Sequence, residues 1–292
     1  MMIEVKNLNY IYQKGTANER RALFDISMTV PDGSLNAFIG HTGSGKSTLI
    51  QHFNALLRPE SGKIIIDGED ITDKKTDLRE IRKKVGLVFQ YPEYQLFEET
   101  VEKDIAFGPK NLGLSGGEIK TRVKQAAELM GISEKNLKKS PFDLSGGEKR
   151  RAAIAGVLAM FPRVLILDEP TAGLDPGGRD NILGIIKRLH SSRPEMIIIF
   201  VSHSMEDVAK TAENIYVFNN GSLAMEGAPS EVFSRAAELE AMGLNVPQIT
   251  RLAERLRSMG YDLPRDIYTV EYAEKAIKKL IISNRRKGQN TD

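Results

Sequence analysis

The sequence has no cysteine and few histidines, and these absences exclude several kinds of site. Without cysteine the 292-residue chain has no disulfide, no thiolate metal site and no cysteine nucleophile. Four histidines leave little room for a histidine-rich metal centre. Disulfide-stabilised folds and cysteine enzymes are thereby excluded.

Long apolar runs and an excess of one charge are also missing. The longest apolar run, Ala152 to Phe161, is far shorter than the ~20 residues that cross a bilayer. The first residues hold no apolar stretch of signal-peptide length. The net charge is +2, from 41 Lys and Arg against 39 Asp and Glu, which does not favour a dedicated nucleic-acid binder. We therefore expect a soluble, cytoplasmic globular protein that does not bind nucleic acid.

Apolar runs of strand length alternate with helical patterns along most of the chain. Four aliphatic runs are typical of strands covered on both faces of a parallel sheet: Leu35 to Ile39, Val85 to Phe89, Val164 to Leu167 and Ile197 to Val201. Helical patterns span Lys46 to Leu57, Gly178 to His190 and Met205 to Ala212. This alternation predicts an α/β layered fold.

Other regions depart from this alternation. Antiparallel strands are expected near the N-terminus, at Ile3 to Val5, Ile26 to Val30 and Ile64 to Asp67. Strand patterns vanish at about residues 92–162, which predicts an inserted helical subdomain. Asn219-Asn220-Gly221 predicts a hairpin turn. We expect a core of residues 1–228 and an appendage of residues 229–292, in which two amphipathic helices precede a frayed basic tail from Arg285.

A glycine-rich loop follows the apolar run that ends at Ile39. It reads Gly40-His41-Thr42-Gly43-Ser44-Gly45-Lys46-Ser47-Thr48, the phosphate-binding pattern G-x-x-x-x-G-K-[ST] between a strand and a helix. Glycines let backbone N–H groups turn inward around phosphates, and the helix N-terminus favours the same anion. We expect Lys46 to reach the β and γ phosphates and Ser47 to bind Mg²⁺. The alternative, a glycine-rich turn without a ligand, is disfavoured by the placement of the strand, Lys46 and Ser47.

A second candidate site is the end of the apolar run Val164 to Leu167, where Asp168 and Glu169 follow. Open α/β sheets bind ligands at the carboxyl ends of their strands. Asp168 suits the Mg²⁺ shell, directly or through water. Glu169 is placed to polarise the attacking water as a base or an orienting group.

The segment Leu144-Ser145-Gly146-Gly147-Glu148 resembles the signature of ABC-type ATPases, and its separation from Asp168 fits that family. Ser145 is a good helix N-cap, and Gly146 and Gly147 permit close backbone approach to an anion. A second copy, Leu114-Ser115-Gly116-Gly117-Glu118, lies too far upstream and lacks the basic residues that follow the first. We interpret this copy as an ordinary N-cap with a capping box.

Further motifs of the same family occur in order. Gln90 resembles the Q-loop glutamine that senses Mg²⁺ and the attacking water, and Asp175 lies in a segment similar to the D-loop. His203 resembles the switch histidine that contacts the γ-phosphate. Tyr12 resembles the aromatic residue that stacks on adenine, with Tyr10 as the alternative and a core role open for either.

The resemblance covers about residues 3–232 and implies a P-loop ABC-type nucleotide-binding fold. Such a fold would have an N-terminal antiparallel β subdomain, a helical insert and, here, a small C-terminal helical appendage. It also implies ATP and Mg²⁺ as ligands and ATP hydrolysis as the activity. In this family the signature of one subunit closes over nucleotide held by another. We therefore expect Ser145, Gly146 and Gly147 to contact nucleotide on a partner ATPase, with Asp175 at the interface.

A narrower resemblance is to the ATPases of energy-coupling factor transporters, of the second-ATPase type. It rests on Gln90 to Phe97, Gly108 to Asn111, Ala155 to Met160, Ser202 to Val208 and Glu231 to Arg255. It implies a partner ATPase in a heterodimer or a homodimer, a transmembrane coupling subunit and a membrane substrate-binding subunit. The location would be peripheral, on the cytoplasmic face of the cell membrane, and the solutes would be vitamins or transition-metal ions.

Several alternatives stay open at this point. A soluble ABC ATPase without a membrane partner is the main rival, but it usually has coiled coils, zinc modules or two nucleotide-binding domains. A docking groove near Tyr91, Tyr94 and Phe97 competes with local packing of that loop. Lys149-Arg150-Arg151 would either face a partner or form a solvated helix face. The appendage would stabilise the dimer, contact the partner ATPase or cover an edge.

Overall fold

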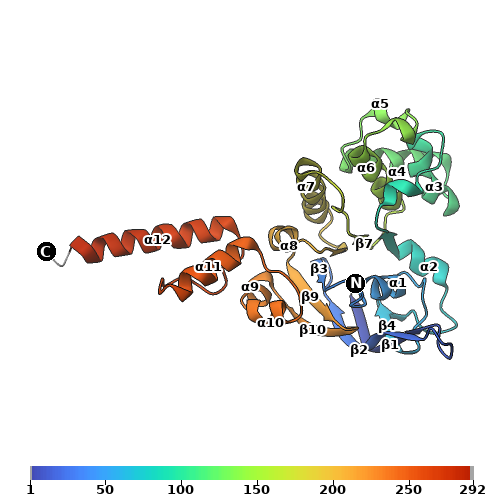
Figure 1. Cartoon of the computed structure of the whole chain (residues 1–292). Helices are drawn as coiled ribbons and strands as arrows, with labels where there is room; N and C mark the ends of the chain where they lie inside the picture. The colour runs from blue at the N-terminus through green and yellow to red at the C-terminus, as the bar shows by residue number, and fades with distance from the viewer. Residues whose placement is uncertain (1, 290–292) are drawn as a thin grey trace.

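A six-stranded sheet lies at the centre of the computed structural model, which describes residues 2–289 (Figure 1). Its strand order is β10-β9-β3-β8-β7-β6. Parallel pairing joins β3 (Leu35–Ile39), β6 (Val85–Val88), β7 (Val164–Asp168), β8 (Ile197–Val201) and β9 (Asn214–Asn219). Every residue of β3, β7 and β8 is buried, which explains their continuous apolar sequences. The α/β prediction is confirmed.

The predicted hairpin closes one edge of this sheet. Strand β9 pairs antiparallel with β10 (Ser222–Gly227) across a two-residue turn. Asn220 and Gly221 have φ angles of 48° and 82°, the left-handed values that a type I′ turn requires at both central positions.

A second, antiparallel sheet packs below the first, in the order β2-β1-β4-β5 (Figure 1). It consists of β1 (Ile3–Tyr12), β2 (Arg20–Val30), β4 (Ser61–Ile66) and β5 (Glu69–Asp70). Strand β1 extends to Tyr12, beyond the predicted Val5. Register shifts after Val5 interrupt the alternation of apolar and polar residues, so the sequence pattern did not reveal the full length of the strand. Apolar side chains of both sheets and of α1 (Lys46–Phe53) fill the space between them.

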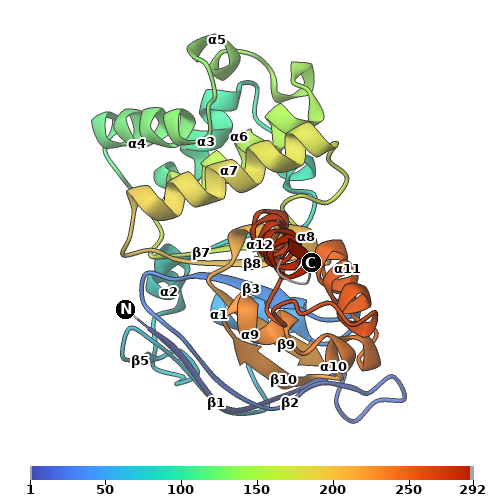
Figure 2. The ribbon, with the colours of Figure 1, turned by 90° about the vertical axis from the view of Figure 1, so that its left-hand side faces the viewer.

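The segment that connects β6 to β7 contains helices and no strand, as predicted for residues 92–162. They are η1 (Pro92–Gln95), α3 (Val101–Asn111), α4 (Gly116–Leu129), α5 (Glu134–Leu137), η2 (Pro141–Asp143) and α6 (Gly146–Leu158). In Figures 1 and 2 they form a separate layer at the top of the molecule. Three further helices flank the central sheet: α2 (Leu78–Lys84), α7 (Pro176–Ser192) and α8 (Met205–Thr211).

The C-terminal region contains α9 (Pro229–Phe233), α10 (Ala236–Ala241), α11 (Gln248–Ser258) and α12 (Val270–Gln289). Helices α9 and α10 join the main core, whereas α11 and α12 share a small apolar cluster of their own. Helix α12 points away from the sheets (Figure 1) and continues to Gln289, so it includes residues 285–289, where the sequence predicts a frayed basic tail. Residues 290–292 lie outside the described part of the chain.

Within residues 2–289 none of the helices combines the length and the apolar character that a bilayer crossing requires.

Candidate functional site

The glycine-rich loop connects β3 to α1, and its backbone requires glycine at two points. Gly45 has a φ of 102°, and a Cβ there would lie 2.8 Å from the carbonyl oxygen of Ala22. At Gly40 a Cβ would lie 2.5 Å from the Oγ of Ser44 and 2.3 Å from a backbone oxygen of β9. The loop therefore folds back on itself in a conformation that larger residues would obstruct.

Lys46 lies at the centre of this loop, 5% exposed. Its Nζ donates hydrogen bonds to the carbonyl oxygens of Gly40 at 2.7 Å and His41 at 3.0 Å. Burial lowers the pKa of Lys46, while the nearby charges of Asp168 and Glu169 oppose that shift. The loop thus holds an ammonium group where an anion would bind.

The two carboxylates at the end of β7 lie beside this ammonium group. Burial raises the pKa of Asp168, and a hydrogen bond from the hydroxyl of Ser47 opposes the shift. Burial and the charge of Asp168 raise the pKa of Glu169 to about 7. Glu169 has a φ of 52°, and its Oε1 lies 3.1 Å from the Nε2 of His203. Burial lowers the pKa of His203, and the nearby charge of Lys46 lowers it further.

A cavity of about 470 Å³ brings most of the predicted site residues together. The predicted residues that line it are Tyr12, Thr42, Gly43, Ser44, Gly45, Lys46, Ser47, Thr48, Gln90, Asp168, Glu169 and His203. Arg20 also lines it, and sequence reasoning missed this residue. Arg20 pairs with Tyr12 across β1 and β2. Extending the predicted hairpin to these two residues would have placed Arg20 beside Tyr12.

The two candidate aromatic residues contact each other, with ring centroids 4.8 Å apart, but they have different surroundings. The hydroxyl of Tyr12 lies 3.1 Å from the Oγ1 of Thr48, within the cavity lining. Tyr10 contacts the ring of His52, at 4.7 Å between centroids, and packs against the apolar cluster between the sheets. Tyr12 is thus the one of the pair that faces the cavity.

The remaining predicted residues lie elsewhere. The backbone of Gly40 and His41 forms the start of the loop, and the Nε2 of His41 lies 3.2 Å from Asn219 Oδ1. Ser145, Gly146, Gly147 and Asp175 do not line the cavity. Ser145 caps α6, and Asp175 caps α7 by accepting a hydrogen bond of 2.6 Å from the Gly178 amide.

The expectation for the basic run after the signature is wrong at Arg150. This residue is 2% exposed and forms an ion pair with Glu93, whereas Lys149 and Arg151 are partly exposed. On a helix, neighbouring residues point in directions about 100° apart, so three basic residues in a row cannot share one face.

The oxygen ligands at the cavity wall suit a Mg²⁺ ion that also binds the phosphates of a nucleotide. Ser47 and Asp168 offer adjacent oxygen atoms at the cavity wall. Among the residues that the structure describes, no group of three His, Cys, Asp or Glu forms a protein-only metal site. Mg²⁺ commonly takes one or two protein ligands and completes its shell with water and phosphate oxygens.

Comparisons with known proteins agree with this geometry. Residues 23–172 match the ABC transporter family. The chain is 57% identical to the energy-coupling factor transporter ATP-binding protein EcfA2 of Clostridium acetobutylicum, over 98% of this chain and 100% of that protein. It is 56% identical to the protein of the same name from Clostridium perfringens, over 97% of this chain and 100% of the relative.

Solved structures give the same family. The structure of cbiO1 from Clostridium perfringens, described as part of the ABC transporter complex cbiONQ, has a TM-score of 0.73 at 40% identity and covers 86% of this chain and 98% of its own. A dimeric ATP-binding cassette bound to ADP and Pi in a post-hydrolysis state has a TM-score of 0.68 at 27% identity, over 77% and 98%. The chain therefore belongs to the ABC transporter ATPases and, within them, to the energy-coupling factor transporter ATP-binding proteins.

Proposed function

We propose that this chain binds ATP with Mg²⁺ and hydrolyses it to energise an energy-coupling factor importer for vitamins or transition-metal ions. One observation carries the proposal: Lys46, Asp168 and Glu169 meet in one cavity, while the signature lies outside it. A complete site then needs a second ATPase, as in a transporter. The rival, a soluble ABC ATPase without a membrane partner, has no comparable support from the relatives.

Nucleotide binding is assigned to the loop and its lysine. The N–H groups of residues 43–48 and the Lys46 ammonium would bind the phosphate oxygens, and Tyr12 would stack on adenine. Ser47, Gln90 and Asp168, which all line the cavity, would hold Mg²⁺. The metal ion, when bound, neutralises charge on the phosphates.

Hydrolysis is assigned to Glu169. Its carboxylate takes a proton from water as the water oxygen bonds to the γ-phosphorus and the bond to the β–γ bridging oxygen breaks, releasing ADP and phosphate. A base with a pKa of about 7 is matched to neutral pH. His203, 3.1 Å away, would hold Glu169 in place and contact the γ-phosphate.

The signature residues and Asp175 do not line the cavity, so we assign them to a contact with a partner ATPase. Exposed Ser145 and Gly146, with half-exposed Gly147, would close over nucleotide on a partner ATPase, and exposed Asp175 would lie at that interface. A heterodimer is the arrangement we favour and a homodimer the alternative. Loss of the γ-phosphate after hydrolysis would open the pair, which is a two-state change able to move a membrane subunit.

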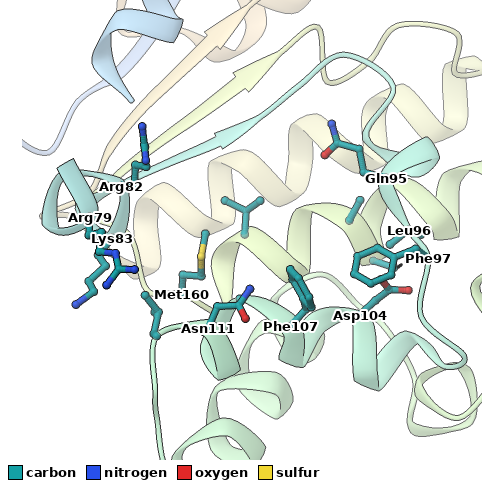
Figure 3. A pocket seen from close by; sticks show the side chains of 16 residues that line it. Arg79, Arg82, Lys83, Gln95, Leu96, Phe97, Asp104, Phe107, Asn111 and Met160 are labelled. Atoms are coloured by element: carbon teal, nitrogen blue, oxygen red, sulfur yellow. Dashed lines mark hydrogen bonds between the residues drawn. The ribbon is translucent and has the colours of Figure 1, made fainter. Parts of the chain in front are cut away.

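Docking of the transmembrane coupling subunit is assigned to a groove of about 610 Å³ beside η1 (Figure 3). Phe97 and Phe107 form its apolar end with ring centroids 5.0 Å apart, and Arg79, Arg82 and Lys83 lie at the other end. Tyr94 is 84% exposed next to it. The protein would therefore sit on the cytoplasmic face of the membrane, and a separate membrane subunit would bind the solute.

Substituting Glu169 by Gln tests the catalytic assignment. We expect ATP binding to persist while kcat falls about 10²–10⁴-fold, the usual loss for a positioned base. In the native chain kcat should rise with pH through about 7, because Glu169 must be deprotonated to accept a proton. Near-normal turnover of Glu169→Gln would contradict the assignment.

The variant Lys46→Ala, by contrast, should lose affinity for the nucleotide.

A further inference from the structure

Arg150 is a buried cation that neither the loop nor the signature uses. It lies in the second turn of α6 and is 2% exposed. Its Nε and one terminal nitrogen donate to both carboxylate oxygens of Glu93, at 3.0 and 2.5 Å. The other terminal nitrogen donates to the carbonyl oxygens of Pro170 at 3.2 Å and Ala172 at 2.5 Å.

These contacts join three parts of the fold that are far apart in sequence. Glu93 belongs to η1, the short helix between Gln90 and the groove. Pro170 and Ala172 belong to the turn that begins at Glu169, and the amide of Ala172 donates to the Glu169 carbonyl oxygen at 3.1 Å. The Glu93 side chain is 14% exposed, so water screens this pair weakly.

A planar guanidinium that binds a carboxylate with two nitrogens has little freedom to slide. A displacement of η1 must therefore either break this bidentate pair or move Arg150, and Arg150 donates to two carbonyl oxygens of the turn that begins at Glu169. One buried side chain thus connects η1 to the turn that begins at Glu169.

We propose that Arg150, with Glu93, is a positioning residue that makes hydrolysis by Glu169 depend on the placement of the η1 segment. This inference rests on the proposed role of Glu169 as the base. Neither Arg150 nor Glu93 lines the nucleotide cavity, so both act through the turn at residues 169–172.

Kinetics of the full chain assembled with its partner ATPase test the proposal. Glu93→Gln removes the carboxylate charge and keeps the shape of the side chain. Arg150→Lys keeps the positive charge and loses the two-nitrogen contact with Glu93. We expect each to lower kcat about tenfold with KM for ATP within twofold, because small displacements of a catalytic group slow chemistry strongly. The double variant should be no slower than either single variant, since one link is broken in all three.

Two matched controls occur in the chain. Lys120 takes the same place after Ser115 that Arg150 takes after Ser145, and it is exposed. Glu99 is exposed and pairs with Lys103, four residues further along the chain. Lys120→Met and Glu99→Gln should leave kcat unchanged. A Glu93→Gln variant with kcat within twofold of the native value, or effects that multiply in the double variant, would overturn the proposal.

Hydrogen exchange supplies a readout that needs no hydrolysis. Glu93→Gln should speed exchange of the amides of Ala172 and Leu174, which donate to the carbonyl oxygens of Glu169 and Thr171. Unchanged exchange there would also overturn the link. If the native assembly hydrolysed no ATP, the proposed function would fail, and exchange at these amides would still decide whether Glu93 controls the turn.

Discussion

The chain contains the sequence Leu-Ser-Gly-Gly-Glu twice, at residues 114–118 and 144–148, and the two copies have the same local structure. Each serine caps a helix and accepts a hydrogen bond from the amide of its glutamate at 3.4 Å. Each glutamate accepts from the serine amide at 2.9 Å and from its hydroxyl at 2.7 Å. Five residues thus determine the cap, but they do not determine the function.

The two copies differ in the residues after the glutamate and in their tertiary surroundings. Five residues after Ser145 comes buried Arg150, whereas the same position after Ser115 is the exposed Lys120. Leu144 is buried and Leu114 is only partly so. Arg150 therefore anchors α6, which carries the signature, to the turn after β7, whereas Lys120 at the matched position of α4 is exposed. Paired substitutions at matched positions test this difference.

The largest expected effect is on stability at the matched basic positions. Arg150→Met leaves the Glu93 carboxylate and two carbonyl oxygens without their donor, which we expect to cost about 3–5 kcal/mol, the usual loss for breaking a buried pair. Lys120→Met should change the free energy of unfolding by less than about 0.5 kcal/mol. Urea unfolding measures both, and equal losses would show that burial of Arg150 is not what separates the copies.

Next comes activity at the matched glycines. Gly147→Asp places a negative charge where phosphate of a partner's nucleotide would bind, and we expect ATPase activity to fall on the order of 100-fold, as when one charge-stabilising contact is lost. Gly117→Asp should leave activity within twofold. A Cβ at Gly117 meets nothing within 4 Å, and one at Gly147 meets only the tip of Arg151 at 3.9 Å, so both variants should fold. Similar rates for the two would remove the functional distinction.

The cap serines should behave alike in stability. Ser115→Ala and Ser145→Ala each remove one capping hydroxyl of the same geometry, so each should cost about 1 kcal/mol. Thermal unfolding measures both. A much larger cost at either position would mean that the two caps are not equivalent locally.

The smallest effect concerns the cap glutamates and pH. Hydrogen bonds from Ser145 and from Asn136, the latter at 2.8 Å, lower the pKa of Glu148 from its ordinary 4.5 to about 2. A depressed pKa stabilises the folded state fully above about 4.5, and this contribution is lost as pH falls towards 2. Glu148→Gln should therefore lower stability at pH 7 and lose its effect near pH 2. Glu118→Gln, without an asparagine partner, should show a weaker pH dependence, which unfolding at several pH values would detect.

The sequence predicted those parts of the fold and site that depend on local pattern. Continuous aliphatic runs identified the buried parallel strands, and the turn at Asn220 followed from residues that tolerate positive φ. The lining of the cavity by Lys46, Ser47 and Asp168 followed from motifs at strand ends.

The features that the sequence did not predict depend on pairing between distant segments. Arg20 reaches the cavity only because β2 pairs with β1 in a shifted register, and that register includes exposed polar residues without a hydrophobic pattern. Arg150 reads as a surface residue in a basic run, because its partner Glu93 lies 57 residues away and its other acceptors are backbone carbonyls. Such contacts leave no periodicity in the sequence.

The central claim is that only the copy at residues 144–148 closes over nucleotide on a partner ATPase. Because the chain has no cysteine, Ser145→Cys and Ser115→Cys each introduce a single thiol at matched exposed N-caps. The direct measurement is the rate of maleimide labelling of each thiol, in a Glu169→Gln chain mixed with the partner ATPase, with and without ATP and Mg²⁺. We predict that ATP slows labelling at position 145 at least tenfold, only with the partner present, and leaves position 115 unchanged. Equal labelling at both positions with ATP would contradict the account.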